Sequence, residues 1–117
     1  MQTSKLLLSS AVFALAAACS SRNAPPAASA DAKAAISAAE AVGAQSEPQA
    51  ALHLKLARDQ TTKADALARD GKDEEARAMI ERAKIDAELA LVLTRDASVR
   101  AQANNEAQRL RELEQNN

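Results

Sequence analysis

Apolar residues recur every three or four positions along most of this chain, and this period predicts helices rather than strands. The composition from Ala30 onwards supports the same prediction, because it is rich in strong helix formers such as Ala, Glu, Lys, Arg and Leu. Two groups of helix-breaking residues interrupt the pattern, Gly43 with Ser46-Glu47-Pro48, and Asp70-Gly71-Lys72. We therefore expect three helices, at about 30–43, 48–69 and 73–114.

The lengths of these helices suggest how they are arranged. At 1.5 Å per residue the third helix is about 63 Å long, while the second and first measure about 33 Å and 21 Å. The first two, placed end to end, nearly match the third. The predicted fold class is thus all-α, a long antiparallel helical hairpin that turns at Gly71 and whose first arm is broken near Gly43–Pro48. Counting outward from the turn pairs Leu67 with Ala76, Ala64 with Met79 and Ile80, Leu56 with Ala87, and Leu52 with Leu91.

Small residues form a seam along the third helix. Positions 76, 80, 83, 87, 90, 94, 97 and 101 follow one another at spacings of four and three, and all but Ile80 and Thr94 are alanine. One interpretation makes these residues the core of the hairpin. The other makes part of the seam a face that binds a partner, with Ala83, Ala87, Ala90, Ala97 and Ala101 as its candidate residues.

The first nineteen residues have the pattern of an export signal. Lys5 is followed by Leu6 to Ala18, about 13 mainly apolar residues, which is too short to span a bilayer but typical of a signal peptide. Cys19 stands directly after three alanines, and the segment resembles a bacterial lipoprotein signal. That resemblance implies that the Cys19 sulfur receives a diacylglyceryl group, that the chain is cut before it, and that the new amino terminus is acylated. The alternative is an ordinary secretory signal with an incidental buried cysteine.

These features divide the chain into three parts. Residues 1–18 are the predicted signal peptide, residues 19–29 the acylated cysteine with a Pro-containing tether about 30 Å long, and residues 30–117 the helical domain. Three acyl chains would anchor the protein stably to a membrane. Because Ser20 rather than aspartate follows the cysteine, lipoprotein sorting implies the outer membrane, facing the periplasm, rather than the inner membrane.

The chemical inventory disfavours catalysis and cofactor binding. The chain of 117 residues carries a net charge of −1, and its single cysteine, histidine and aromatic residue offer no metal site, base-stacking platform or charge relay. Acidic and basic residues alternate along the helices, which argues against nucleic acid as a partner. His53 is predicted to be a surface histidine, and the acids Asp73-Glu74-Glu75 are interpreted as a helix start rather than as paired catalytic carboxylates.

A second resemblance covers about 70 residues of the predicted mature chain. The residues that carry it are Gly43-Ala44, Pro48, Gly71, Glu75-Ala76-Arg77 with Ala83, and Asp86 to Ala90. In this pattern the chain resembles a family of alanine-rich helical lipoproteins of Gram-negative bacteria that is known as a domain of unknown function. The resemblance implies a helical, lipid-anchored protein and supplies no activity.

The function expected from the sequence is a structural or protein-interaction role in the cell envelope, without catalysis. Its partners would be the membrane, through the lipid, and either an envelope protein or further copies of the chain. One alternative is a small coiled-coil lipoprotein that contacts peptidoglycan non-covalently, and another is a single tetratricopeptide-like hairpin that binds peptides. Only 16 large aliphatic residues follow the signal, so we expect a helical monomer with a low melting temperature unless a partner adds buried area.

Overall fold

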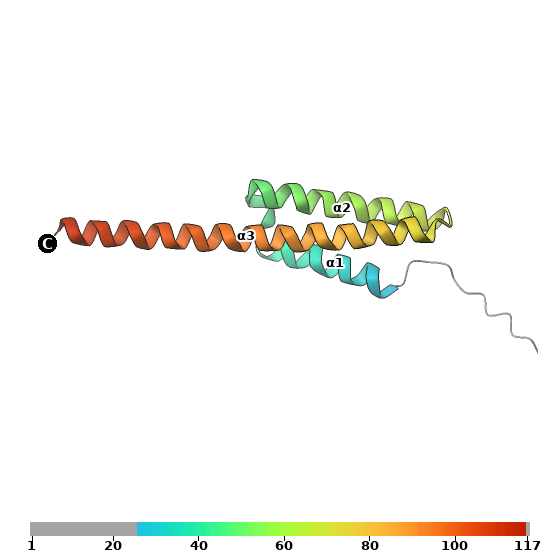
Figure 1. Ribbon diagram of the computed structural model, residues 1–117, viewed down its shortest axis with the longest axis horizontal. Coiled ribbons are helices and arrows are strands. Elements are labelled where there is room, and N and C mark those ends of the chain that lie inside the picture. Colours follow the sequence, from blue (N-terminus) through green and yellow to red (C-terminus); the bar gives the residue numbers. More distant parts are fainter. Residues whose placement is uncertain (1–25, 117) are drawn as a thin grey trace, which may run out of the picture.

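The computed structural model describes residues 26–116, which form an all-α fold of three helices (Figure 1). Helix α1 spans Pro26–Ala41, α2 spans Pro48–Arg69 and α3 spans Asp73–Gln115, with a short 3-10 turn, η1, at Ala44–Ser46. The predicted division into three helices is confirmed, and so is the antiparallel hairpin of α2 and α3. No strand occurs within residues 26–116.

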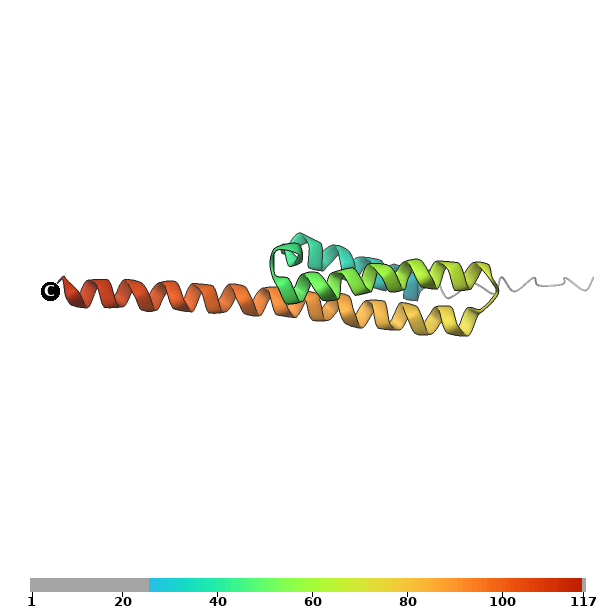
Figure 2. The ribbon, with the colours of Figure 1, turned by 90° about the horizontal axis from the view of Figure 1, so that it is seen from above.

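The comparison of helix lengths predicts that α1 lies in line with α2. This prediction is wrong. The chain reverses after α1, and α1 lies beside the first half of α3 and runs parallel to it (Figures 1 and 2). The physical reason is the partner surface that each arrangement offers. In line with α2, α1 would face the polar Asn104, Asn105 and Gln108 of the second half of α3, whereas beside the first half it contacts apolar residues such as Ile80 and Ala83. The result is a three-helix bundle from which half of α3 projects.

The start of α1 also corrects the predicted boundary of the tether. The sequence predicts a tether up to Ser29 and a helix from Ala30, but α1 begins at Pro26. A proline suits the first turn of a helix, because its φ angle is already helical and the amide hydrogen it lacks would have no partner there. Ala28 packs against the buried cluster around Ala32, so part of the predicted tether belongs to the folded unit.

Helix α2 begins and ends at local signals that the sequence makes visible. The Glu47 carboxylate accepts a hydrogen bond from the Ala50 amide and caps the helix, directly before Pro48. At the other end Gly71 has φ +73°, and two hydrogen bonds, from Gly71 N to Ala68 O (3.1 Å) and from Lys72 N to Leu67 O (2.9 Å), close a Schellman motif. This closed end lets the chain turn directly into α3.

The reversal between α1 and α2 depends on Gly43. Its φ of +84° is left-handed, its amide bonds to Glu40 O at 3.0 Å, and its own carbonyl accepts a hydrogen bond from the Ser46 amide at 2.9 Å. Glycine reaches this region without the steric cost that a side chain adds. The buried Ala44 then fixes the short 3-10 turn against the end of the bundle.

The core of the bundle is made almost entirely of alanine. Ten of the twelve buried hydrophobic residues are alanines, and the other two are Leu54 and Ile80. Nine of them form two clusters, one near the α1–α2 reversal around Leu54 and Ala90, and one toward the α2–α3 turn around Ala64 and Ile80. Alanine allows close approach of the helices but buries little area, which agrees with the thin core expected from the sequence.

The buried face of α2 differs in part from the predicted one. Ala64 packs with Ile80 and Met79, as predicted. Leu52 and Leu56, however, are 56% and 37% exposed, and the buried residues of α2 are Ala50, Leu54, Ala57 and Ala64. The predicted pairs place the large side chains of Leu52 and Leu56 in the interface with α3. The bundle instead buries the seven-residue repeat that starts at Ala50, because that face lies against both other helices.

Candidate functional site

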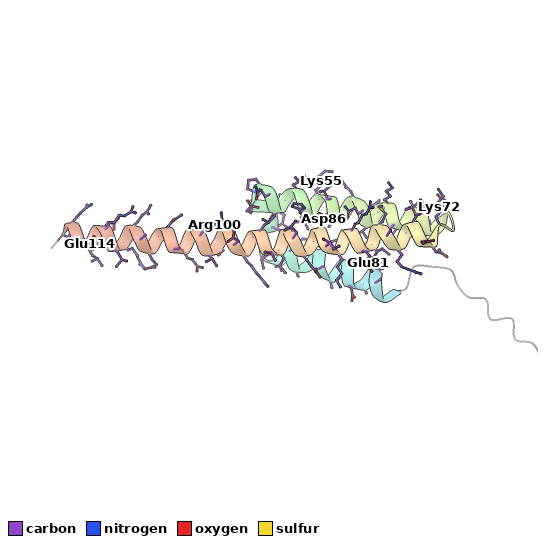
Figure 3. All side chains as sticks on the ribbon, in the orientation of Figure 1. Lys55, Lys72, Glu81, Asp86, Arg100 and Glu114 are labelled. Atoms are coloured by element: carbon purple, nitrogen blue, oxygen red, sulfur yellow. The ribbon has the colours of Figure 1, made fainter. Side chains whose placement is uncertain are left out.

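The most distinctive surface of the molecule is the part of α3 that leaves the bundle. Figure 3 shows Arg100 and Glu114 on α3 beyond the ends of α1 and α2. No residue from 98 to 116 is buried, although Val99, Leu110 and Leu113 are large and apolar. We call residues 98–115 the projecting half of α3.

The five alanines predicted as a possible partner face lie in two different surroundings. Ala83, Ala87 and Ala90 are fully buried inside the bundle, so the chain itself covers them. Ala97 is half-buried where the bundle ends, and Ala101 is exposed on the projecting half. Both line a shallow hollow with Glu47, Gln49 and Asn104 at the junction of η1, α2 and α3. Within this fold, only Ala97 and Ala101 of the five remain accessible to a partner.

A second apolar face runs along α3 on the side opposite the seam. It consists of Ile85, Leu89, Val92, Val99, Leu110 and Leu113, which are 38% to 63% exposed. Ile85, Leu89 and Val92 each lie two residues after a buried alanine, which is a turn of about 200° around a helix. We call these six residues the outward face of α3. The sequence carries this signal, because the same spacing of four and three repeats with an offset of two.

The outward face widens at the point where the bundle ends. Val42, the residue after α1, is 40% exposed and lines a shallow hollow together with Thr94, Ser98 and Val99. Val42 therefore adds apolar surface beside Val99, where the bundle gives way to the projecting half.

A polar cluster joins α2 to α3 in the middle of the bundle. His53 Nδ1 lies 2.8 Å from Asp86 Oδ1, and the Gln60 side-chain amide donates to Asp86 Oδ2 at 2.7 Å. The side chains of His53 and Asp86 are only 27% and 19% exposed. The His53 side chain stays partly exposed, as expected for a surface histidine, but its contact with Asp86 across the interface was not predicted, because sequence spacing alone does not reveal such a pair.

This cluster has the geometry of a structural contact. Asp86 bonds to two α2 residues that are seven positions apart, so it holds two turns of α2 in register with α3. The contribution of the cluster is therefore to the pairing of the helices.

A second polar contact holds α1 against α2. The Nε and Nη2 atoms of Arg58 donate to Oε1 of Glu40, at 3.1 Å and 2.5 Å. Both side chains are at least one-third exposed, so solvent weakens the pair and its contribution to stability is small. The sequence places an acid four residues before a base in four pairs, Asp59–Lys63, Asp65–Arg69, Asp73–Arg77 and Asp96–Arg100. Of these the structure forms Asp96 with Arg100 at 2.6 Å, whereas Asp59 pairs with Lys55.

The acids Asp73, Glu74 and Glu75 lie in the first turn of α3, as predicted for a helix start. Within residues 26–116, no group of three His, Cys, Asp or Glu side chains is placed to hold a metal ion. In that same part of the chain, none of the helices combines the length and the apolar character that crossing a bilayer requires. Cys19, the predicted lipid attachment residue, lies outside the described residues.

Comparisons with protein-family models, with curated proteins and with solved structures found no match for this chain. The resemblance to helical lipoproteins and the lipid at Cys19 stay predictions from the sequence.

Proposed function

We propose that this chain is a non-catalytic, lipid-anchored protein of the cell envelope that acts by binding other proteins. The observation that carries the proposal is the projecting half of α3, which leaves Val99, Leu110 and Leu113 about 60% exposed. Side chains of this kind, gathered on one face, are typical of a surface that a partner covers. Because residues 98–116 add nothing to the buried core, their contribution to the protein is their surface.

The direction in which the helices run suits an anchor at the amino-terminal end. Helix α1 begins near the α2–α3 turn, at the end of the bundle opposite the projecting half (Figure 1). A lipid on Cys19 would attach the chain at that end, away from the projecting half. With two or more acyl chains such an anchor is stable. In Gram-negative bacteria the sequence favours the outer membrane, with the helices in the periplasm.

Mass spectrometry of the protein purified from its own cells tests the anchor. We expect the amino-terminal peptide to begin at Cys19 and to carry the mass of the acyl groups. A Cys19→Ser variant should lose this mass and leave the membrane fraction. A bare thiol at Cys19, or a leader that is still attached, would contradict the anchor but would leave the binding role standing.

Affinity capture from gently solubilised membranes tests the binding role. We expect Leu110→Glu to reduce the proteins that copurify with the wild-type chain, because a charge on the projecting half opposes apolar contact. The matched control is Leu52→Glu, since Leu52 is similarly exposed on α2 and lies outside the projecting half. Equal copurification with all three chains would argue against a binding role for α3.

A further inference from the structure

We infer that the outward face of α3 pairs with the same face of a second copy of this chain, in antiparallel orientation. This inference deepens the proposed binding role by naming the partner, and it does not depend on the lipid anchor. It rests on the repeat of the outward face, on its area and on the charges that interrupt it.

The repeat indicates that the partner is a helix. The outward face follows a seven-residue period from Ile85 to Leu113, with Asp96, Ala103 and Glu106 at its remaining positions. A period of 3.5 residues keeps one face of a helix against another helix over many turns. The face is about 42 Å long, so a partner must supply an apolar helix of similar length. Within the described chain, α3 itself is the helix of this length.

The area of the face approaches what a dimer needs. Its six aliphatic side chains are each 38% to 63% exposed. Together they offer on the order of 600 Å² of apolar surface, which approaches the roughly 800 Å² that each partner contributes to an interface of standard size. A two-fold dimer uses the same patch on both copies, so one such face per chain is sufficient.

The charges on the face favour the antiparallel orientation. A parallel pair in register would set Asp96 against Asp96 and Glu106 against Glu106, which places like charges opposite each other. An antiparallel pair that sets Ile85 opposite Leu113 avoids both contacts, because Asp96 then lies near Gln102 and Glu106 near Val92 of the second copy.

Photocross-linking of the full chain in living cells tests this inference. A photoreactive phenylalanine analogue is placed at position 110 in cells that also express a copy with a different tag. We expect a cross-linked product that carries both tags, and we expect peptide mapping to join position 110 to residues 75–92 of the other copy. The same analogue at position 52, on the exposed side of α2, is the matched control and should give no such product.

A second variant shows whether the apolar contact causes the pairing. With the analogue at position 99, Leu110→Glu should lower the yield of the two-tag product at least about tenfold, which corresponds to 1.4 kcal/mol. Leu52→Glu should leave the yield unchanged, and circular dichroism should show both variants equally helical. Both leucines are exposed, so neither substitution disturbs the core.

Three outcomes would overturn the inference. A product joining position 110 to position 110 would show parallel pairing, and cross-links only to a different protein would show that the partner is not a second copy. Cross-links to a different protein would still support the proposed binding role. No cross-link from position 99 or 110 to any protein would remove both proposals.

Discussion

The two halves of α3 belong to one continuous helix but lie in different surroundings. In the first half, Ala76, Ile80, Ala83, Ala87 and Ala90 are buried against α1 and α2, whereas in the projecting half nothing is buried. Both halves are made mainly of helix-forming residues, although Ser98, Asn104 and Asn105 make the projecting half the weaker sequence. Helix-forming composition therefore does not reveal whether a segment is packed.

The comparison also shows how an exposed helix of this length can persist. An isolated helix of fewer than about 12 to 15 residues is marginal in water, mainly because the first turn is costly to form. The bundle supplies that first turn, so the projecting half only has to extend an existing helix. Substitutions that separate the two halves test this division, and we describe them from the largest expected effect to the smallest.

The largest difference is expected for a buried charge. Ala87→Glu places a carboxylate where the side chain is fully buried, and it should lower the free energy of unfolding by about 3 kcal/mol or more. Ala103→Glu makes the same change on the projecting half and should alter the free energy of unfolding by less than about 0.5 kcal/mol in dilute, monomeric protein. Thermal unfolding followed by circular dichroism measures both. Similar melting temperatures for the two variants would mean that the first half of α3 is not packed.

A smaller difference is expected when a large side chain is shortened. Leu54 is 1% exposed. The substitution Leu54→Ala should lower the free energy of unfolding by about 2 to 5 kcal/mol, because it removes one of the two large buried side chains. Leu110→Ala should cost less than about 0.5 kcal/mol in dilute, monomeric protein. Urea titration at low protein concentration measures both values. If Leu110→Ala proved as costly as Leu54→Ala, the projecting half would have to be packed in the monomer.

The interhelical polar cluster should give an intermediate to small effect. Asp86→Ala removes the acceptor of both His53 and Gln60, and it should cost about 1 to 3 kcal/mol, because two partly buried donors lose their partner. The control is Asp59→Ala, which removes an exposed ion pair with Lys55 and should cost a few tenths of a kcal/mol. Urea titration distinguishes the two. Equal costs would show that the cluster contributes no more than a surface pair.

The smallest effect concerns the projecting half alone. Asn104→Ala should raise its helix stability by about half a kcal/mol, because alanine is the stronger helix former. Amide hydrogen exchange should show slower exchange in residues 98–115 and no change in the first half of α3. In dilute wild-type protein, the amides of residues 98–115 should exchange faster than those of the bundle. Equal protection from exchange would instead show that the two halves unfold together.

Much of the fold follows from a few residues that act locally. Gly43, Pro48 and Gly71 divide the helices correctly, because glycine and proline restrict the backbone whatever surrounds them. The seam of α3 is also predicted correctly through Ala90, since its spacing reflects helix geometry alone. The position of α1 could not be predicted in this way. A break at Gly43 permits either a continued or a reversed direction, and only the packing against Ile80 and Ala83 decides between them.

The candidate site was less predictable than the fold. Three of the five alanines predicted as a possible partner face are covered by α1 and α2, and recognising this requires knowing where α1 lies. The contact of His53 with Asp86 joins residues 33 positions apart and depends on the register of two helices. The outward face was readable in principle, because Ile85, Leu89 and Val92 repeat with the period of the seam at an offset of two.

The unbroken course of α3 from the bundle to its carboxyl end makes the molecule a spacer of defined length. Each residue of a helix adds 1.5 Å, so removing seven residues from the projecting half would draw its end back by about 10 Å and rotate it by only about 20°. Removing two residues would shorten it by about 3 Å but turn the remaining surface to nearly the opposite side. Reach and facing can therefore be changed separately in this chain, by choosing how many residues are deleted.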